Sequence, residues 1–250
     1  MICIFIGFPV AFSLMGVAVF FGSLRFGDLL VHQLVAKVDD VASYYVLSAV
    51  PLFIFMGCML EKSGISEKLF EAMHIITRKL PGGLAIATVI LCVFFAAASG
   101  VVGAAESVVG LMVITVMLRH GYNRGLISGT ICAGGSLGTI IPPSVVVVIL
   151  SPIAGVGVGN LFVGIMIPGL ILATLYIIYI LARCIIWPND GPADVSRSES
   201  RTLMQNLWII ISALVPLLTL IFSVLGSIML GWATPTEAGA MGALGTVVLT

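Results

Sequence analysis

Long runs of apolar residues without a charge are the feature that most constrains this chain. Residues 1–24 contain no charged side chain, and further apolar runs cover 43–60, 161–187 and about 206–230. A helix of about 20 apolar residues crosses the ~30 Å hydrocarbon core of a bilayer. Apolar residues make up 60% of the sequence and charged residues 9%, too few for the surface of a soluble fold. We predict an all-α, multi-pass integral membrane protein, with loops where charges gather between the runs.

The composition also excludes several classes of function. The formal net charge is +0, so no basic face for nucleic acid is expected. The five cysteines stand singly, without the spacing of a metal or redox site. The segment 134–138 (GGSLG) has the form of a hydrolase nucleophile motif, but no strand is predicted before it and all three histidines fall in predicted loops or surface segments. We predict that the chain is not an enzyme and binds no cofactor.

Residues 83–118 are too long for one straight span. As one helix these 36 residues would extend about 54 Å. The small residues at 96–103 divide them into halves of about 15 residues, each about 23 Å long and short of crossing. Basic residues flank both ends, which places both on one side of the membrane. We predict a re-entrant helical hairpin; two full spans would give the same orientation.

Residues 125–152 form an apolar run that is interrupted at 134–144 (GGSLGTIIPPS). The adjacent Pro142 and Pro143 remove two backbone donors and disfavour helical geometry just before each ring. We therefore predict a helix broken at membrane depth. Its unwound backbone must line a cavity or be buried in protein, because lipid cannot satisfy it.

The basic residues orient this arrangement. With the hairpin flanks in the cytoplasm, nine of the 11 basic residues lie inside and only Arg25 and Lys37 lie outside, as the positive-inside rule favours. The nine are Lys62, Lys68, Arg78, Lys79, Arg119, Arg124, Arg183, Arg197 and Arg201. The polar segment 188–205 then becomes a cytoplasmic loop.

Four regions follow from this pattern: 1–80, 81–160, 161–230 and 231–250. The first contains scaffold helices and, after Glu61, an amphipathic surface helix with Leu69, Met73 and Ile76 on one face. The second contains the hairpin and the broken helix and is the expected transport element. The third contains further transmembrane helices and the cytoplasmic loop.

The last region, 231–250, resembles the start of a second repeat that the chain does not complete. Residues 235–242 repeat the Pro-x5-Met-Gly spacing of 9–16, and in the predicted topology the two segments enter from opposite faces. An inverted repeat gives this relation, although so short a match also arises by chance. Thr234 and Glu237 have the spacing of a capping box, with Pro235 at the first helical position.

Hydroxyl side chains gather at the two interruptions. Ser99 and Gly100 lie at the predicted hairpin tip, and Ser136, Thr139 and Ser144 lie around the break. Hydroxyl and carbonyl oxygens can replace the water around a small cation, and half-helix N-termini favour a carboxylate. These residues predict a sodium and anion site, with no other metal.

Two alternatives stay open at this point. Small residues also let helices pack closely, which is the expected role of Gly121, Gly125 and Gly129 at four-residue spacing. Glu106 lies alone in the second half of the hairpin, where an intramembrane carboxylate costs about 2.5 to 3.5 kcal/mol and indicates function by default. In a water-filled or protein-lined setting it is equally a solvated or capping residue.

Together with these segments, motifs along nearly the whole chain resemble the large membrane (M, DctM-like) subunit of tripartite ATP-independent periplasmic (TRAP) transporters. They are GFPVAF at 7–12, VPLFIFMG at 50–57, LPGGLA at 80–85, the Ser99-Gly100 tip, RHGY at 119–122, GTIIPPS at 138–144 and ATPTEA at 233–238.

The resemblance implies a sodium-driven elevator transporter, built as an inverted repeat, in the bacterial inner membrane. It would take a small organic acid from a periplasmic binding protein (DctP-like) and work with a small membrane subunit (DctQ-like). The family site carries over to Ser99, Gly100, Gly103, Gly135, Ser136, Gly138, Thr139, Pro142 and Ser144. Many members have a Ser-Gly-Ser tip, whereas Val101 follows Gly100 here. Members are also longer, with a second hairpin and broken helix beyond Thr250.

Two rival interpretations remain. The chain is a truncated or split membrane fragment without transport of its own, or it is a stand-alone sodium/dicarboxylate carrier that needs no periplasmic protein. The sequence does not indicate which substrate is carried.

Overall fold

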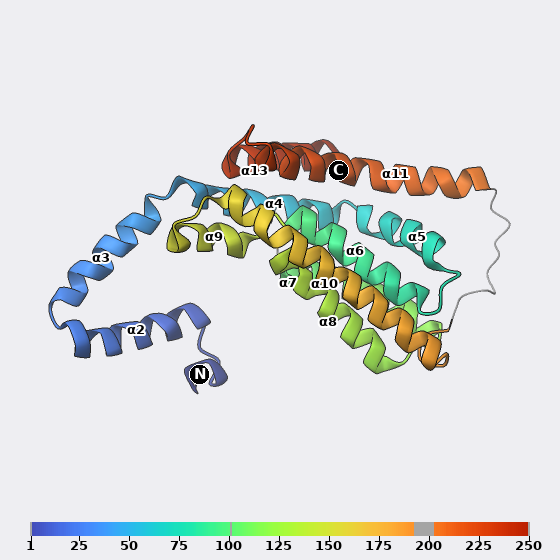
Figure 1. Cartoon of the computed structure of the whole chain (residues 1–250), viewed down its shortest axis with the longest axis horizontal. Coiled ribbons are helices and arrows are strands. Elements are labelled where there is room, and N and C mark those ends of the chain that lie inside the picture. The colour runs from blue at the N-terminus through green and yellow to red at the C-terminus, as the bar shows by residue number, and fades with distance from the viewer. Residues whose placement is uncertain (1, 101, 193–202, 250) are drawn as a thin grey trace. The chain divides into compact units, whose positions relative to one another are not determined.

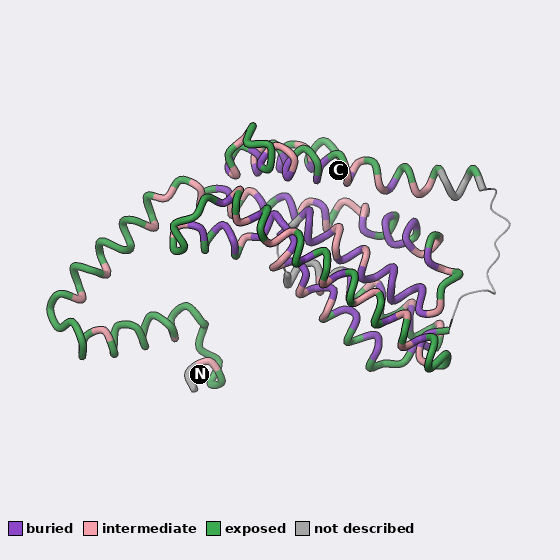
Figure 2. Tube along the Cα trace, in the orientation of Figure 1, coloured by how far each residue is buried: buried purple, intermediate pink, exposed green. Residues whose placement is uncertain are grey.

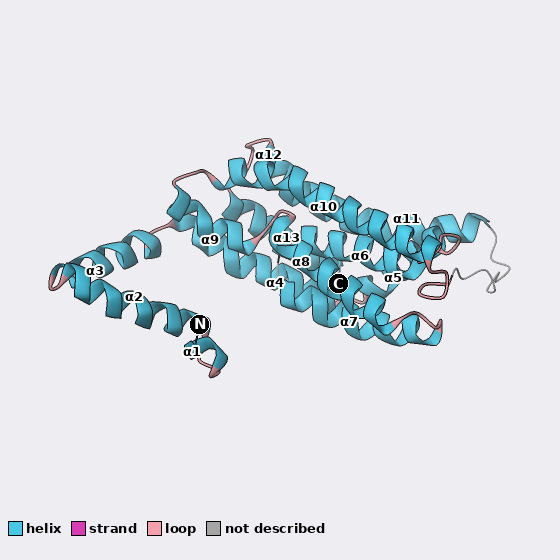
Figure 3. Cartoon of the chain, turned by 60° about the horizontal axis from the view of Figure 1, so that its bottom comes forward, coloured by secondary structure: helices cyan, strands magenta, loops and turns pink. Residues whose placement is uncertain are grey.

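The computed structural model describes residues 2–100, 102–192 and 203–249, and they divide into two compact units, 1–45 and 46–250. Every regular element in the described residues is helical, which confirms the predicted all-α fold (Figure 3). The predicted divisions at 80, 160 and 230 stay predictions.

The first unit differs from the prediction of one span over 1–24. It contains α1 (Ile2–Phe5), α2 (Val10–Phe26) and α3 (Leu29–Ala42). The helix breaks because Gly7 has a φ of 99° and because Pro9 disfavours helical geometry at the residue before it. The charged stretch from Asp28 onward, a predicted loop, is largely helix α3, since no glycine or proline interrupts residues 28–42.

The second unit begins with η1 (Tyr45–Ser48), α4 (Ala49–Lys62), α5 (Ile65–Thr77), α6 (Gly83–Ser99) and α7 (Val102–Arg119). It continues with α8 (Arg124–Ile140), α9 (Val145–Ala154), α10 (Val158–Ile186), α11 (Leu203–Ile221), η2 (Phe222–Gly226), α12 (Ser227–Met229) and α13 (Pro235–Leu249) (Figure 1).

Three described segments are long and apolar enough to cross a membrane: Tyr45–Lys62, Val158–Ile186 and Trp208–Met229. They fall on three of the predicted runs. The pair α8 and α9 is bent by 41° at its break and forms a fourth span if the two helices cross as one. The broken helix is therefore confirmed. The part of the predicted loop at 193–202 lies outside the described residues.

Helix α6 is the centre of the second unit. It packs against α4, α5, α7, α8 and α10, and most of its residues are buried (Figure 2). Helices that are apolar all round are typical of such central positions. Its polar Thr88 is fully buried, and the Thr88 hydroxyl donates to the Leu84 carbonyl oxygen at 2.8 Å.

Helix α5 is amphipathic, as predicted, but the end of its buried face differs. Leu69 and Met73 are buried, and the helix packs on α6 and α11. Ile76, expected on the same face, is 52% exposed. Thr77 is the buried residue at this end of the helix, because its hydroxyl donates to the carbonyl oxygens of Met73 at 3.0 Å and Gly83 at 2.8 Å.

Helices α6 and α7 form a hairpin whose open ends meet. The backbone N–H of Leu84 donates to the hydroxyl oxygen of Tyr122, just beyond α7, at 3.2 Å. With 17 and 18 residues, the helices extend about 26 and 27 Å, short of a ~30 Å hydrocarbon core. The re-entrant position of the hairpin in a bilayer stays a prediction.

The turn after α10 holds both ends of this hairpin. The N–H of Gly82 donates to the Gly191 carbonyl oxygen at 3.0 Å, and the N–H of Asn123 donates to the Asp190 carbonyl oxygen at 3.0 Å. The Asp190 carboxylate also accepts from the side chains of Asn123, at 2.9 Å, and Arg183, at 3.0 Å. We call this group of contacts the hairpin base.

The predicted capping box of α13 is confirmed. The Glu237 carboxylate accepts from the Thr234 backbone N–H at 2.8 Å, and the Thr234 hydroxyl oxygen accepts from the Glu237 N–H at 3.4 Å. This reciprocal pair satisfies donors that the first helical turn leaves free.

Replacing Tyr122 by Phe should destabilise the hairpin base. The Leu84 N–H lies in the first turn of α6 and would lose its partner in a buried setting, at a cost of about 1–3 kcal/mol. Thermal unfolding of the full-length permease in detergent measures this cost. Tyr176→Phe is the matched control, because no described residue bonds its hydroxyl; equal melting temperatures for the two variants would contradict the assignment.

Candidate functional site

The tip of the hairpin contacts the break between α8 and α9. Gly100 ends α6 with a φ of 62°, and its carbonyl oxygen accepts from the Val145 N–H at 3.4 Å. A Cβ on Gly100 would overlap the Pro143 carbonyl group and lie 3.4 Å from the Cα of Ser144. The two interruptions predicted separately from the sequence are therefore one place in the structure.

The break has extended backbone at both ends. Ile141 follows α8 with φ −81° and ψ 124°, and Ser144 precedes α9 with φ −102° and ψ 125°. Pro142 and Pro143 lie between them and are buried. The extended backbone of Ile141 is the conformation expected before a proline, and it explains why α8 stops at Ile140.

Ser144 contributes a buried hydroxyl without a partner. The residue is 0% exposed, and its Oγ makes no hydrogen bond to any residue that the structure describes. A buried hydroxyl normally has a partner, and one without costs free energy. A Cβ on Gly100 would lie 3.4 Å from the Ser144 Cα, so the residue lies beside the hairpin tip and its hydroxyl is a candidate ligand oxygen.

Two further predicted site residues have hydroxyls that already donate. Ser136 donates to the Ala133 carbonyl oxygen at 2.7 Å, and Thr139 donates to the Ser136 carbonyl oxygen at 2.8 Å. Both residues are half-buried. Their hydroxyl oxygens retain lone pairs, so they can still accept a bond or bind a cation.

Three more predicted site residues, Gly103, Gly138 and Ser99, lie at helix ends near the tip and the break. Gly103 belongs to the first turn of α7, and Gly138 is buried near the end of α8. Ser99 is the last residue of α6, and its side chain lies outside what the structure describes. Among the described residues, no group of His, Cys, Asp or Glu has the composition of a metal site.

Close approach of α6 and α7 to α8 depends on two glycines. A Cβ on Gly134 would lie 2.7 Å from the Cys92 Sγ of α6, and one on Gly135 would overlap the Glu106 carboxyl of α7. Both glycines are buried. The sequence did not predict that the half-buried Glu106 lies against Gly135, because the partner comes from another helix.

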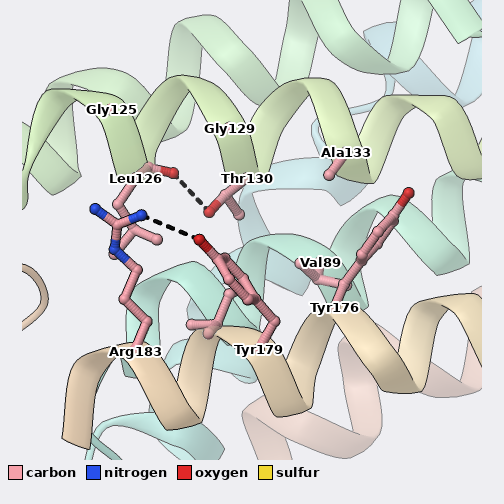
Figure 4. A pocket seen from close by; sticks show the side chains of 10 residues that line it. Val89, Gly125, Leu126, Gly129, Thr130, Ala133, Tyr176, Tyr179 and Arg183 are labelled. Atoms are coloured by element: carbon pink, nitrogen blue, oxygen red, sulfur yellow. Dashed lines mark hydrogen bonds between the residues drawn. The ribbon is translucent and has the colours of Figure 1, made fainter. Parts of the chain in front are cut away.

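The expected packing role of Gly125 and Gly129 is wrong. A Cβ on Gly129 would meet no atom within 4 Å, and one on Gly125 would meet only Asn123. Both instead line a pocket of about 270 Å³ between α8 and α10 (Figure 4). Sequence reasoning also missed the tyrosines Tyr176 and Tyr179 that line it. Gly121, the third glycine, has a φ of 75° in the turn after α7.

Gly100→Ala should destabilise the chain more than Gly121→Ala. Both positions have positive φ, which costs a residue with a Cβ about 1–2 kcal/mol. Only the Gly100 Cβ would also overlap backbone, at Pro143, for a further ~1–3 kcal/mol. Thermal unfolding of both variants measures the difference. Equal destabilisation would show that the tip and the break are not in contact.

Comparison with known proteins identifies the family of the chain. The family model for the "Tripartite ATP-independent periplasmic transporter, DctM component" matches residues 1–250. The chain is 34% identical over 223 residues to the C4-dicarboxylate TRAP transporter large permease protein DctM of Pseudomonas aeruginosa, covering 88% of this chain and 50% of the relative.

Two other similar proteins are also TRAP transporter permeases. The DctM permease of Vibrio cholerae is 32% identical, over 96% of this chain and 51% of its own length. The isethionate TRAP transporter permease DctMQ of Oleidesulfovibrio alaskensis is also 32% identical, over 95% of this chain and 36% of its own length. The chain thus spans about half the length of the DctM relatives. All three are named as transporter permeases, in agreement with the prediction of a non-enzymatic protein. The chain belongs to the DctM family, the large permease component of TRAP transporters.

Proposed function

We propose that this chain forms part of a permease that couples sodium entry to uptake of a small organic acid. The observation that carries the proposal is the unpartnered, fully buried Ser144 hydroxyl at the contact between the hairpin tip and the broken helix. Membership of a transporter family supports it.

The proposed sodium and substrate site surrounds this contact. Its oxygens come from hydroxyls at the break and from backbone that the two prolines free from helical bonding. The N-terminus of α9 begins directly after Ser144 and favours an anionic group such as a carboxylate. The site residues are Ser99, Gly100, Gly103, Gly135, Ser136, Gly138, Thr139, Pro142 and Ser144.

Substrate class and partners are part of the same proposal. The relatives' names include C4-dicarboxylate and 2,3-diketo-L-gulonate, both carboxylates. We propose a bacterial inner-membrane location, a small DctQ-like membrane subunit and a DctP-like periplasmic binding protein that delivers the acid. Family membership favours this arrangement over a stand-alone sodium/dicarboxylate carrier. Because the chain spans about half of its DctM relatives, the proposal concerns the whole permease.

Ser144→Ala should weaken sodium binding without lowering stability. The change removes one oxygen ligand, which should raise the sodium concentration for half-maximal effect by about tenfold, or ~1.4 kcal/mol. It breaks no hydrogen bond to a described residue, because the hydroxyl has no partner among them. Sodium-dependent thermal stabilisation of the full-length permease measures both quantities.

Ser151→Ala is the matched control. Ser151 is likewise a buried serine and lies within α9, but its hydroxyl donates to the Val156 carbonyl oxygen at 2.6 Å. This variant should lose about 1 kcal/mol of stability and keep its sodium dependence. Unchanged sodium dependence in Ser144→Ala would remove the residue from the site.

Glu106→Gln tests whether the carboxylate contributes to this site. Gln has nearly the same shape, so packing against Gly135 should persist. Gly135 lies about 7.5 Å along α8 from Ile140, the last residue before the break, close enough for a charge in a poorly solvated region to favour a cation. We expect a several-fold weaker sodium response at unchanged melting temperature. An unchanged response would identify Glu106 as a solvated or packing residue.

A further inference from the structure

The pocket between α8 and α10 lies away from the hairpin tip and is not used by the proposed transport site. Its volume is about 270 Å³. Helix α8 contributes small residues and α10 contributes two tyrosines and an arginine (Figure 4). The lining residues are Val89, Gly125, Leu126, Gly129, Thr130, Ala133, Tyr176, Tyr179, Ile180 and Arg183.

Most of the pocket is an apolar slot. Gly125 and Gly129 lie on its α8 side and are exposed. A Cβ built on Gly129 would have no other atom within 4 Å. The rings of Tyr176 and Tyr179 project from α10 toward α8 (Figure 4). The Thr130 hydroxyl donates to its own helix, to the Leu126 carbonyl oxygen at 2.7 Å. The slot therefore suits a slender apolar group.

One end of the slot is polar and held in place. The Arg183 Nη1 donates to the Tyr179 hydroxyl oxygen at 3.1 Å, and its Nε donates to the Asp190 carboxylate at 3.0 Å. Asn123 donates to the other oxygen of that carboxylate. These bonds orient the guanidinium, and no described residue bonds its second amino group.

A second, more open hollow of about 590 Å³ adjoins this end. It shares Tyr179 and Arg183 with the slot and is completed by Ala182, Ile186, Trp187 and Asp190. Tryptophan and tyrosine side chains, which are apolar at one end and polar at the other, are typical of the boundary between lipid tails and headgroups. The polar end of the slot has this composition.

The charges around the hairpin base favour an anion. The segments 78–83, 119–125 and 183–192 that meet there contain five basic residues and one acidic residue, four net positive charges. The basic residues are Arg78, Lys79, Arg119, Arg124 and Arg183, and the acidic residue is Asp190. Basic pockets between transmembrane helices of this kind bind lipid headgroups.

We propose that this pocket binds an anionic phospholipid. One acyl chain lies in the slot along Gly125 and Gly129, and Arg183 and Tyr179 bind the phosphate. A soluble anion would leave the apolar slot unused. A partner helix would not enter the slot, because a helix with its side chains is about 10–12 Å in diameter and the slot has a volume of about 270 Å³.

Gly129→Leu and Gly164→Leu provide a matched test in the full-length permease. A Leu at 129 should fill the slot, whereas a Cβ on Gly164, an exposed residue of α10 outside the pocket lining, also meets nothing within 4 Å. The purified permease is delipidated and titrated with dioleoyl-phosphatidylglycerol, and native mass spectrometry counts the bound lipid. Dioleoyl-phosphatidylcholine and inorganic phosphate are parallel probes.

The wild type and Gly164→Leu should retain phosphatidylglycerol in preference to phosphatidylcholine. Gly129→Leu should bind it about tenfold more weakly or worse, the loss expected when two methylene groups lose apolar contact. Equal retention by Gly129→Leu and the wild type would overturn the proposal. Saturation of the site by inorganic phosphate alone would overturn the proposal in favour of a free anion. Loss of a bound protein subunit from Gly129→Leu, with lipid retention unchanged, would overturn it in favour of a protein contact.

Discussion

The contact of Gly100 with Pro143, Ser144 and Val145 is the constraint on which the rest of the second unit depends. A bilayer cannot hydrogen-bond unwound backbone, so each interruption of a membrane helix must be covered by protein or face water. Here two interruptions cover each other: the Gly100 carbonyl oxygen accepts the Val145 N–H, and the missing Cβ makes room for Pro143. Polar backbone is thereby brought together within an apolar bundle, the arrangement that ion sites in membrane proteins require.

The hairpin base is the counterpart of this contact at the other end of α6 and α7. Gly82 and Asn123 flank the hairpin, and both bond the turn at 190–191 that follows α10. The base is held by backbone bonds and an Arg183–Asp190 ion pair, and within the described residues the tip is bonded to the break by the Val145 N–H. The proposed ligand site lies at the tip, at the opposite end of the hairpin from these base contacts.

Some of this was predictable because it depends on neighbours in the chain. Length excluded a straight helix over 83–118, the double proline required a break before Ser144, and the spacing of Thr234 and Glu237 indicated their capping box. The same local chemistry would also have placed a break at Gly7–Pro9, where apolar length alone suggested a continuous span. Ile76 fits the helical period of α5, but Thr77 ends the buried face because its hydroxyl bonds Gly83.

What local patterns could not supply is the identity of the partner across a helix contact, as the glycines of α8 show. Gly125 and Gly129 leave space, while Gly134 and Gly135 are covered by Cys92 and Glu106 from other helices. The residue type is the same, and only the opposing helix decides whether a missing side chain opens a pocket or permits close packing. Helix α8 consequently lines the proposed lipid slot with its first half and carries the proposed ion site at its end, so one helix connects the two sites.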